Sequence, residues 1–217
     1  MQTLIELKNV TAGYDGQAQI KDVSLTIAEN DFVGITGPNG GGKTTLLRTM
    51  LGLLPPMSGT IAYYQHGRPA SRLTFGYLPQ YNAIDRDFPI TVEETVLTGL
   101  SCMKRPWMPF SRRQKEMAEL AIRQMGLEQL AAHPIKALSG GQLQRTLMAR
   151  AIAANPPILV FDEPNTHIDR ESEDRLHDML DRMRADHTII MVSHDVEYVR
   201  SHARTLVEMN EHATISS

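Results

Sequence analysis

The sequence predicts an α/β fold in which a parallel sheet is accompanied by an N-terminal antiparallel β-layer and an inserted helical subdomain. Three observations lead to this class. Short apolar runs bounded by Pro or polar residues, the pattern of buried parallel strands, occur at 32–35, 158–161 and 188–192. Apolar and polar side chains nearly alternate near the N-terminus, as in half-buried antiparallel strands. Residues 91–154 have no strand-like run and show helical periodicity instead.

Length and composition indicate one compact domain over residues 1–217. Within it we expect a core with its β-layer at about 1–88 and 155–210, and the helical subdomain at about 89–154. The formal net charge of −3 provides no general basic field for nucleic acid or anionic lipid, so any phosphate binding must be local. The longest apolar runs are too short to cross a bilayer.

The N-terminal part of the chain begins with the predicted β-layer and continues into a strand, a loop and a helix. Apolar residues spaced two apart indicate the antiparallel strands: Ile5, Leu7, Val23, Leu25 and Ile27. After the strand at 32–35 and a glycine-rich turn, helical spacing begins. The residues that carry it are Leu46, Leu47, Met50 and Leu51.

Helices dominate the middle of the chain. Three stretches, at 92–103, 112–125 and 140–154, have helical spacing and are divided by prolines. An amphipathic crossover helix is predicted over 171–184, between the strands at 158–161 and 188–192. The residues after about Asn210 are expected to form a loose tail.

A glycine-rich loop between the strand at 32–35 and the following helix matches the P-loop pattern. Backbone N–H groups of such a loop surround phosphate oxygens, a lysine reaches the β- and γ-phosphates, and a hydroxyl is offered to Mg²⁺. The alternative is a glycine-rich turn with a chance lysine. The predicted nucleotide-binding residues are Gly37, Pro38, Asn39, Gly40, Gly41, Gly42, Lys43, Thr44 and Thr45, with Thr44 also on Mg²⁺.

Two further segments could act on phosphate. Asp162 and Glu163 end a buried strand, where Asp162 would hold Mg²⁺ and Glu163 would polarise the attacking water; the alternative is an ordinary strand end before a turn. Ser139 with Gln142 reads as a helix-capping box. That box does not account for Gly140 and Gly141 in the first turn, where glycine costs up to about 1 kcal/mol, so a ligand is expected to approach this backbone closely.

Together with a histidine after the strand at 188–192, these motifs in this order resemble an ATP-binding cassette (ABC) ATPase, from Leu4 to about Met209. The resemblance implies a P-loop NTPase core, ATP and Mg²⁺ as cofactors, and Ser139 to Gln142 as a signature that completes the site of a second subunit. It implies that Tyr14 stacks on adenine, that Gln80 contacts Mg²⁺ or the water, and that His194 contacts the γ-phosphate. Each of these three could instead be an ordinary loop tyrosine, a solvated turn glutamine or a structural histidine.

The resemblance also assigns Asp169 to the loop that links the subunits of the dimer, where His167 is bulkier than the alanine that the family commonly has. It implies a homodimer of ATPase subunits that drives a membrane permease, on the inner, cytoplasmic face of the cell membrane. Residues 81–99, with Asp-Phe-Pro-Ile-Thr-Val, are similar to the corresponding segment of zinc, manganese and iron uptake ATPases, which implies such a substrate and a metal-binding solute receptor. The same segment could simply start a helix.

Other functions remain open at this point. The ATPase could belong to a siderophore importer, or to a soluble assembly complex such as one for iron-sulfur clusters. A small-molecule kinase or GTPase is disfavoured, because neither needs the segment at 138–142.

Overall fold

The structure, a computed structural model, describes residues 2–80, 84–165, 170–209 and 213–216. The chain divides into two compact units. The first unit comprises Met1–Leu73 and Met183–Ser217, and the second comprises Thr74–Arg182. The expected boundaries of a helical subdomain at about 89 and 154 lie within the second unit and stay a prediction.

The first unit contains the N-terminal antiparallel sheet, in the order β2-β1-β4-β5. Leu7 pairs with Leu25 on one side and with Ile61 on the other. Leu7, Val23, Leu25 and Ile27 are all buried, so the alternating apolar positions form the core side of the layer as predicted. The strands are β1 (Thr3–Tyr14), β2 (Gln17–Ala28), β4 (Ser58–Gln65) and β5 (Arg68–Ala70).

A second sheet of the first unit contains β10, β9, β3 and β8 as successive neighbours. β3 (Phe32–Thr36) runs parallel to both β8 (Thr188–Val192) and β9 (Thr205–Met209). Every residue of β3 and β8 is buried, which confirms the strand prediction from their continuous apolar runs.

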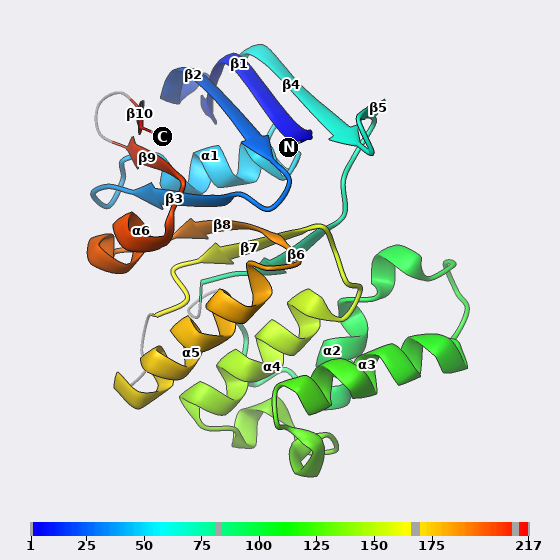
Figure 1. Ribbon diagram of the computed structural model, residues 1–217. Helices are drawn as coiled ribbons and strands as arrows, with labels where there is room; N and C mark the ends of the chain where they lie inside the picture. The colour runs from blue at the N-terminus through cyan, green and yellow to red at the C-terminus, as the bar shows by residue number, and fades with distance from the viewer. Residues whose placement is uncertain (1, 81–83, 166–169, 210–212, 217) are drawn as a thin grey trace. The chain divides into compact units, whose positions relative to one another are not determined.

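Two helices pack on the strands of the first unit (Figure 1). α1 (Lys43–Met50) follows β3 and lies against the antiparallel sheet. α6 (Val196–His202) packs on β3, where a Cβ added to Gly34 would come within 2.0 Å of Val199 Cγ1. Glycine at that position therefore permits the close approach of helix and strand.

The prediction of a loose tail after Asn210 is wrong for residues 213–216. They form β10 (Ala213–Ser216), which pairs antiparallel with β9 through Ala213 and Met209, Thr214 and Glu208, and the residues that follow. Only one large apolar side chain lies in β10, so the strand depends on backbone hydrogen bonds that no hydrophobic pattern reveals.

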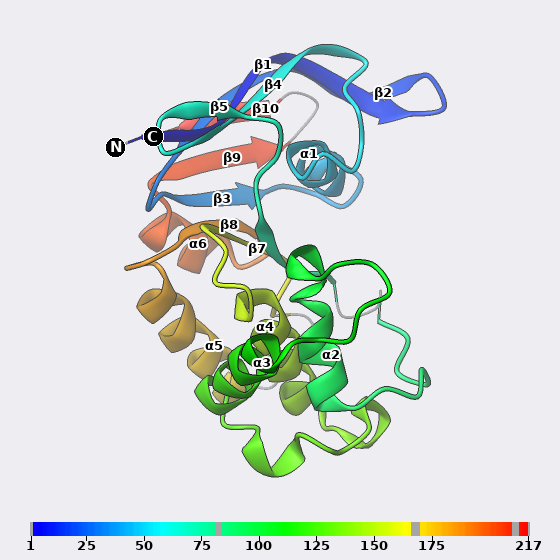
Figure 2. The same ribbon diagram turned by 90° about the vertical axis from the view of Figure 1, so that its right-hand side faces the viewer.

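The second unit combines two parallel strands, labelled in Figure 1, with several helices, which Figure 2 shows from another side. β6 (Phe75–Leu78) pairs with β7 (Ile158–Asp162), and Leu78 lies opposite Phe161. The α-helices are α2 (Val92–Thr98), α3 (Arg112–Gln124), α4 (Gly140–Ile152) and α5 (Arg170–Met183). Short 3-10 helices cover Ser101–Met103, Glu128–Leu130 and Ile135–Ala137. Within the described residues, no helix is long and apolar enough to cross a membrane.

The first of these helices is shorter than predicted, because α2 ends at Thr98 rather than continuing to 103. Gly99 follows it, and a Cβ added there would lie 2.0 Å from the carbonyl oxygen of Arg150 in α4. The chain passes so close to α4 that only glycine fits, and the direction changes into the 3-10 turn at Ser101–Met103.

Candidate functional site

The P-loop lies between β3 and α1, as the motif requires. Gly37, Gly40 and Gly42 have φ angles of 139°, 80° and 90°, in the region that favours glycine. A Cβ added to Gly37 would lie 2.1 Å from the carbonyl oxygen of Met209, so no larger residue fits there. These glycines allow the loop a backbone conformation that residues with a Cβ atom rarely adopt.

Lys43 is turned back into its own loop. Its ammonium group donates hydrogen bonds to the carbonyl oxygens of Gly37, at 2.9 Å, and Pro38, at 3.0 Å. The side chain is 5% exposed, and both contacts are to neutral acceptors. An anionic phosphate oxygen would be a stronger acceptor for the same ammonium group.

The first turn of α1 is held by the β-layer. Thr45 is buried, and its hydroxyl donates to the side-chain oxygen of Gln19 in β2 at 2.6 Å. A Cβ added to Gly42 would lie 2.7 Å from Ile20 Cγ2, so β2 also packs directly on the loop. Thr44 is half-buried beside them. Sequence reasoning missed Gln19, because a polar residue in an alternating strand carries no signal of its own.

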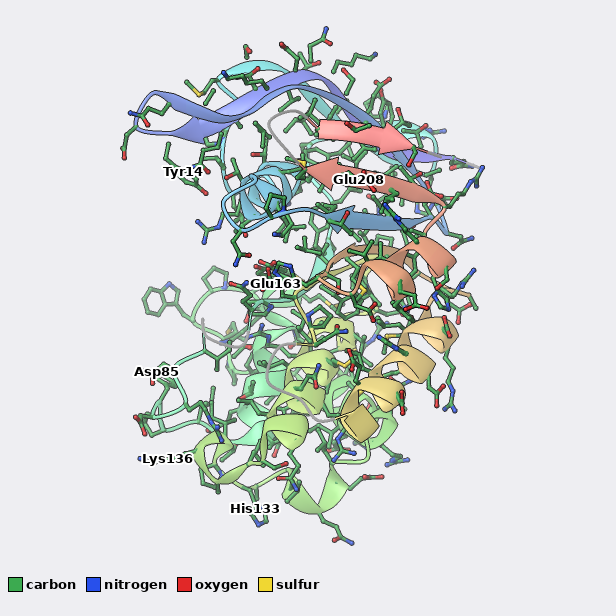
Figure 3. All side chains as sticks on the ribbon, turned by 90° about the vertical axis from the view of Figure 1, so that its left-hand side faces the viewer. Tyr14, Asp85, His133, Lys136, Glu163 and Glu208 are labelled. Atoms are coloured by element: carbon green, nitrogen blue, oxygen red, sulfur yellow. The ribbon has the colours of Figure 1, made fainter. Side chains whose placement is uncertain are left out.

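Tyr14 projects from the hairpin that joins β1 and β2 (Figure 3). Its ring is 36% exposed, and its hydroxyl accepts a hydrogen bond from Arg48 Nη1 of α1 at 3.2 Å. A Cβ added to Gly13 would lie 1.9 Å from the carbonyl oxygen of Gln17, so the hairpin closes only with glycine before the tyrosine. An accessible aromatic face held near α1 can stack on a base.

His194 comes to the same edge of the sheet as the P-loop. It follows β8, whose Val192 pairs with Ile35 of β3, and the backbone N–H of Ser193 donates to the carbonyl oxygen of Ile35 at 3.2 Å. The carboxyl ends of these two parallel strands are thus neighbours. The structure therefore places His194 and the P-loop at the same edge of this sheet, within the first unit.

In the second unit, the ends of β6 and β7 bring two predicted residues into direct contact. Gln80 Nε2 donates to Glu163 Oε2 at 2.5 Å, although the two residues are 83 positions apart in the chain. Glu163, labelled in Figure 3, has a φ of 52°, an unusual backbone conformation for a residue other than glycine. Such conformations occur often at functional sites, where the surrounding structure holds them in place.

Asp162 is the last residue of β7 and is 3% exposed. Its Oδ2 accepts a hydrogen bond from the hydroxyl of Tyr77, a residue of β6, at 3.3 Å. Tyr77 was not predicted, although its place three residues before Gln80 in a neighbouring strand is a signal that could have been used. A buried carboxylate with oxygen ligands near it is a typical donor for a hard cation.

The helix that carries the signature begins with a complete capping box. The hydroxyl of Ser139 accepts from the backbone N–H of Gln142 at 3.3 Å, and the Gln142 side chain accepts from the backbone N–H of Ser139 at 2.8 Å. Ser111 and Gln114 cap α3 with the same two distances. Both helices have 13 residues, so the cap by itself does not require the glycines of α4.

These glycines distinguish the two helices. α3 begins with two arginines, whereas α4 begins with Gly140 and Gly141, which leave the backbone N–H groups of the first turn without side chains above them. Ser139 is exposed, and both glycines are half-buried. The N-terminus of α4 is therefore open to an anion, in addition to its capping.

The segment after Gln80 is tied to the turn that precedes Ser139. Arg86 donates to the carbonyl oxygen of Leu138 at 2.5 Å, and Lys136 forms an ion pair with Asp87 at 2.6 Å. The hydrogen bond from Lys136 and its charge lower the pKa of the Asp87 carboxyl. Arg86 and Asp87 are thus in direct contact with the turn that leads into α4.

The predicted residues are distributed over the two units. Tyr14, the P-loop and His194 belong to the first unit, whereas Gln80, Asp162, Glu163 and the Ser139 signature belong to the second. Asp169 and His167 lie outside the described residues. On either side of them, the Gln144 side chain of α4 donates to the carbonyl oxygen of Pro164, and Asn165 Nδ2 donates to Glu173 Oε1 at 2.8 Å.

The sequence and the fold both match known proteins. The model of the ABC transporter family matches residues 20–166. The manganese transport system ATP-binding protein MntB of Bacillus subtilis is 37% identical, over 89% of this chain and 78% of its own. The high-affinity zinc uptake system ATP-binding protein ZnuC of the same organism is also 37% identical, over 91% of this chain and 87% of its own.

Among solved structures, the dimeric bacterial ABC transporter cassette MJ0796 is 28% identical, with a TM-score of 0.79 over 96% of this chain and 95% of that one. A post-hydrolysis state of the same cassette, bound to ADP and Pi, is 27% identical, with a TM-score of 0.81 over 99% and 98%. These likenesses confirm the predicted ABC ATPase fold. With the P-loop geometry they lead to one conclusion: the chain belongs to the ABC transporter family, as a cassette that binds and hydrolyses ATP.

Proposed function

We propose that this ATPase energises the uptake of a divalent metal ion, zinc or manganese, through a partner permease. The observation that carries the proposal is the similarity to the zinc and manganese ATP-binding proteins over most of both chains. No residue of this chain needs to touch the ion, because the cassette supplies energy and the permease supplies the path. Iron or a siderophore is the alternative cargo.

In the proposed mechanism, the first unit binds the nucleotide. Tyr14 stacks on adenine, and the backbone N–H groups of 37–45 surround the phosphates. The ammonium group of Lys43 leaves the carbonyl oxygens of Gly37 and Pro38 for the more strongly accepting phosphate oxygens. His194, at the same sheet edge, contacts the γ-phosphate.

The second unit provides the group that activates water. Glu163 is the general base, which accepts the proton of the attacking water as its oxygen bonds to the γ-phosphorus and the bond from that phosphorus to the bridging oxygen breaks, releasing ADP and phosphate. The Gln80 side chain donates a hydrogen bond to Glu163 Oε2 in this structure, and the carboxylate retains acceptor sites for the proton, so Gln80 would orient the base.

The donor set fits Mg²⁺, the cation that ATPases of this kind use. The hydroxyl of Thr44, the buried carboxylate of Asp162 and the amide oxygen of Gln80 are all hard oxygen donors. When bound, the cation neutralises charge on the β- and γ-phosphates. The residues are thus suited to the ion without any nitrogen or sulfur ligand.

We further propose a homodimer in which Ser139, Gly140, Gly141 and Gln142 of one subunit bind the ATP held by the P-loop of the other. The open first turn of α4 supports this role, since the capping box alone does not need glycines. Asp169 would lie in the loop between the subunits.

The permease would dock on the region from Gln80 to Gly99. Within it Phe88 is 58% exposed, and the segment is linked to the signature helix by Arg86 and Asp87. Movement of a docked permease would therefore reach Ser139 through these contacts. The chain would act at the inner face of the cell membrane, with a metal-binding solute receptor on the other side.

The experiment that tests this function is growth of a deletion strain under metal chelation. We expect low cellular zinc or manganese, restored by the wild-type gene and by Lys21→Ala, an exposed surface control, but not by Lys43→Ala. The wild-type protein should fractionate with membranes through its permease. Normal metal content in the deletion strain, together with purely soluble fractionation, would point to an assembly ATPase instead.

A further inference from the structure

The segment between α2 and α3 has a charge unlike that of the rest of the chain. Residues 95–115 contain five basic and no acidic side chains, whereas the whole chain has a net charge of −3. The basic residues are Lys104, Arg105, Arg112, Arg113 and Lys115. Among the described residues, an ion pair holds Arg112, to Glu116 at 2.9 Å, and no carboxylate lies within ion-pair distance of Lys104, Arg105 or Arg113.

The same segment exposes large apolar side chains. Trp107, the only tryptophan of the chain, is 100% exposed, and Met103 and Met108 are more than half exposed. Trp107 has a φ of 66°, so the turn after Pro106 directs the backbone through a conformation that is unusual for an aromatic residue. Exposed apolar side chains that gather in one place indicate an interaction surface.

A groove of about 340 Å³ lies beside this turn, within the second unit. Three methionines line it, Met103, Met108 and Met117, and three cations line it as well, Lys104, Arg105 and Arg113. The ammonium group of Lys104 lies 4.7 Å from the centre of the Phe110 ring, which holds this part of the loop together. The groove thus offers both an apolar lining and positive charge.

We propose that residues 103–113, here called the basic loop, bind the anionic phospholipid surface of the membrane. Lys104, Arg105 and Arg113 would contact lipid phosphates, while Trp107 and Met108 would enter the region between headgroups and acyl chains. A peptide in the groove would pair the charges but leave Trp107 uncovered, since that residue does not line the groove. A broad membrane surface would contact the basic side chains and Trp107 at the same time.

This inference goes beyond the proposed function, because neither ATP hydrolysis nor the choice of ion depends on it. It provides a second attachment, separate from the permease contact at Gln80 to Gly99. A cassette held at the membrane by this loop alone would already be oriented there before it meets its permease.

Vesicle binding of the full chain tests the proposal, with the emission of Trp107 as the signal. With phosphatidylglycerol and phosphatidylcholine vesicles, we expect a blue shift, quenching by brominated acyl chains and weaker binding in high salt. With pure phosphatidylcholine vesicles, the blue shift, the quenching and the binding should all be small. The triple variant Lys104→Gln, Arg105→Gln, Arg113→Gln should bind about 10²-fold more weakly, from about fivefold for each cation near an anionic surface.

The matched control removes three exposed cations of the first unit, Lys21→Gln, Arg68→Gln and Arg72→Gln, and should bind almost as the wild type does. ATPase activity in solution should be unchanged in both triple variants, which separates loss of lipid binding from loss of folding or of the ATPase itself. Equal binding by the two triple variants, or equal emission changes on both kinds of vesicle, would overturn the proposal. Loss of binding only on vesicles that carry the permease, whatever their lipid, would assign the loop to a protein and would overturn it too.

Discussion

Replacing Ser139 by alanine separates the two roles of that residue, because the chain contains its own control. Ser111 has the same capping box, the same two hydrogen-bond distances and a helix of the same length, and its hydroxyl also donates to Gln114 Oε1 at 3.0 Å. Each alanine variant should lose about 1 kcal/mol of unfolding free energy, the usual value of a serine cap. For a chain of 217 residues this lowers Tm by about 2–4 °C.

The two variants should differ in turnover. If the Ser139 hydroxyl donates to the γ-phosphate held by the other subunit, its loss costs about 1.5–3 kcal/mol in the transition state, or roughly 10- to 10²-fold in ATPase rate. Ser111→Ala should keep the wild-type rate per folded molecule. Steady-state ATPase assays and thermal unfolding of both variants give the comparison. Equal turnover of the two variants, with equal losses of Tm, would refute the role in the partner's site and leave only the cap.

Two other predictions concern the P-loop and the capping of α2. Lys43→Gln should weaken ATP binding about 10- to 10²-fold, since a charged hydrogen bond is lost, while Lys21→Gln should leave ATP binding unchanged. Nucleotide titration measures the affinity of both variants. Wild-type affinity in the Lys43 variant would contradict the assignment. Hydrogen bonds from the backbone N–H and the hydroxyl of Thr91 lower the pKa of the Glu94 carboxyl in the folded chain. The ionised carboxylate therefore stabilises the fold fully above the unfolded pKa of about 4.3, and this stabilisation is lost as the pH falls through the folded pKa. Glu94→Gln should thus lower the urea midpoint at pH 7, with the difference from the wild type vanishing in acid; a constant difference would show that the charge is irrelevant.

The strands of the core could be predicted because their residues are buried on both faces. Every residue of β3, β7 and β8 is buried, so each leaves an unbroken apolar run in the sequence. β4 and β9 could not be found in this way. β4 has half-buried and exposed residues without clear alternation, and β9 alternates over only five residues.

In the candidate site, too, some features could be predicted from the sequence and others could not. The P-loop could be predicted from local sequence, since glycine, lysine and threonine must stand at fixed spacing between a strand and a helix. The contact between Gln80 and Glu163 could not, because it joins residues 83 positions apart through the pairing of β6 and β7. Likewise, the bond from Thr45 to Gln19 depends on how the β-layer packs on α1.

The central claim is that two copies of this chain bind ATP between the P-loop of one and the Ser139 signature of the other. Sizing chromatography of Glu163→Gln with Mg-ATP tests it most directly, because loss of the base slows hydrolysis by about 10²- to 10⁴-fold and preserves the bound nucleotide. We predict an ATP-dependent dimer that reverts to monomer when Ser139→Arg is added to the same chain. A Glu163→Gln variant that remains monomeric with ATP, or a dimer that Ser139→Arg leaves intact, would contradict the claim.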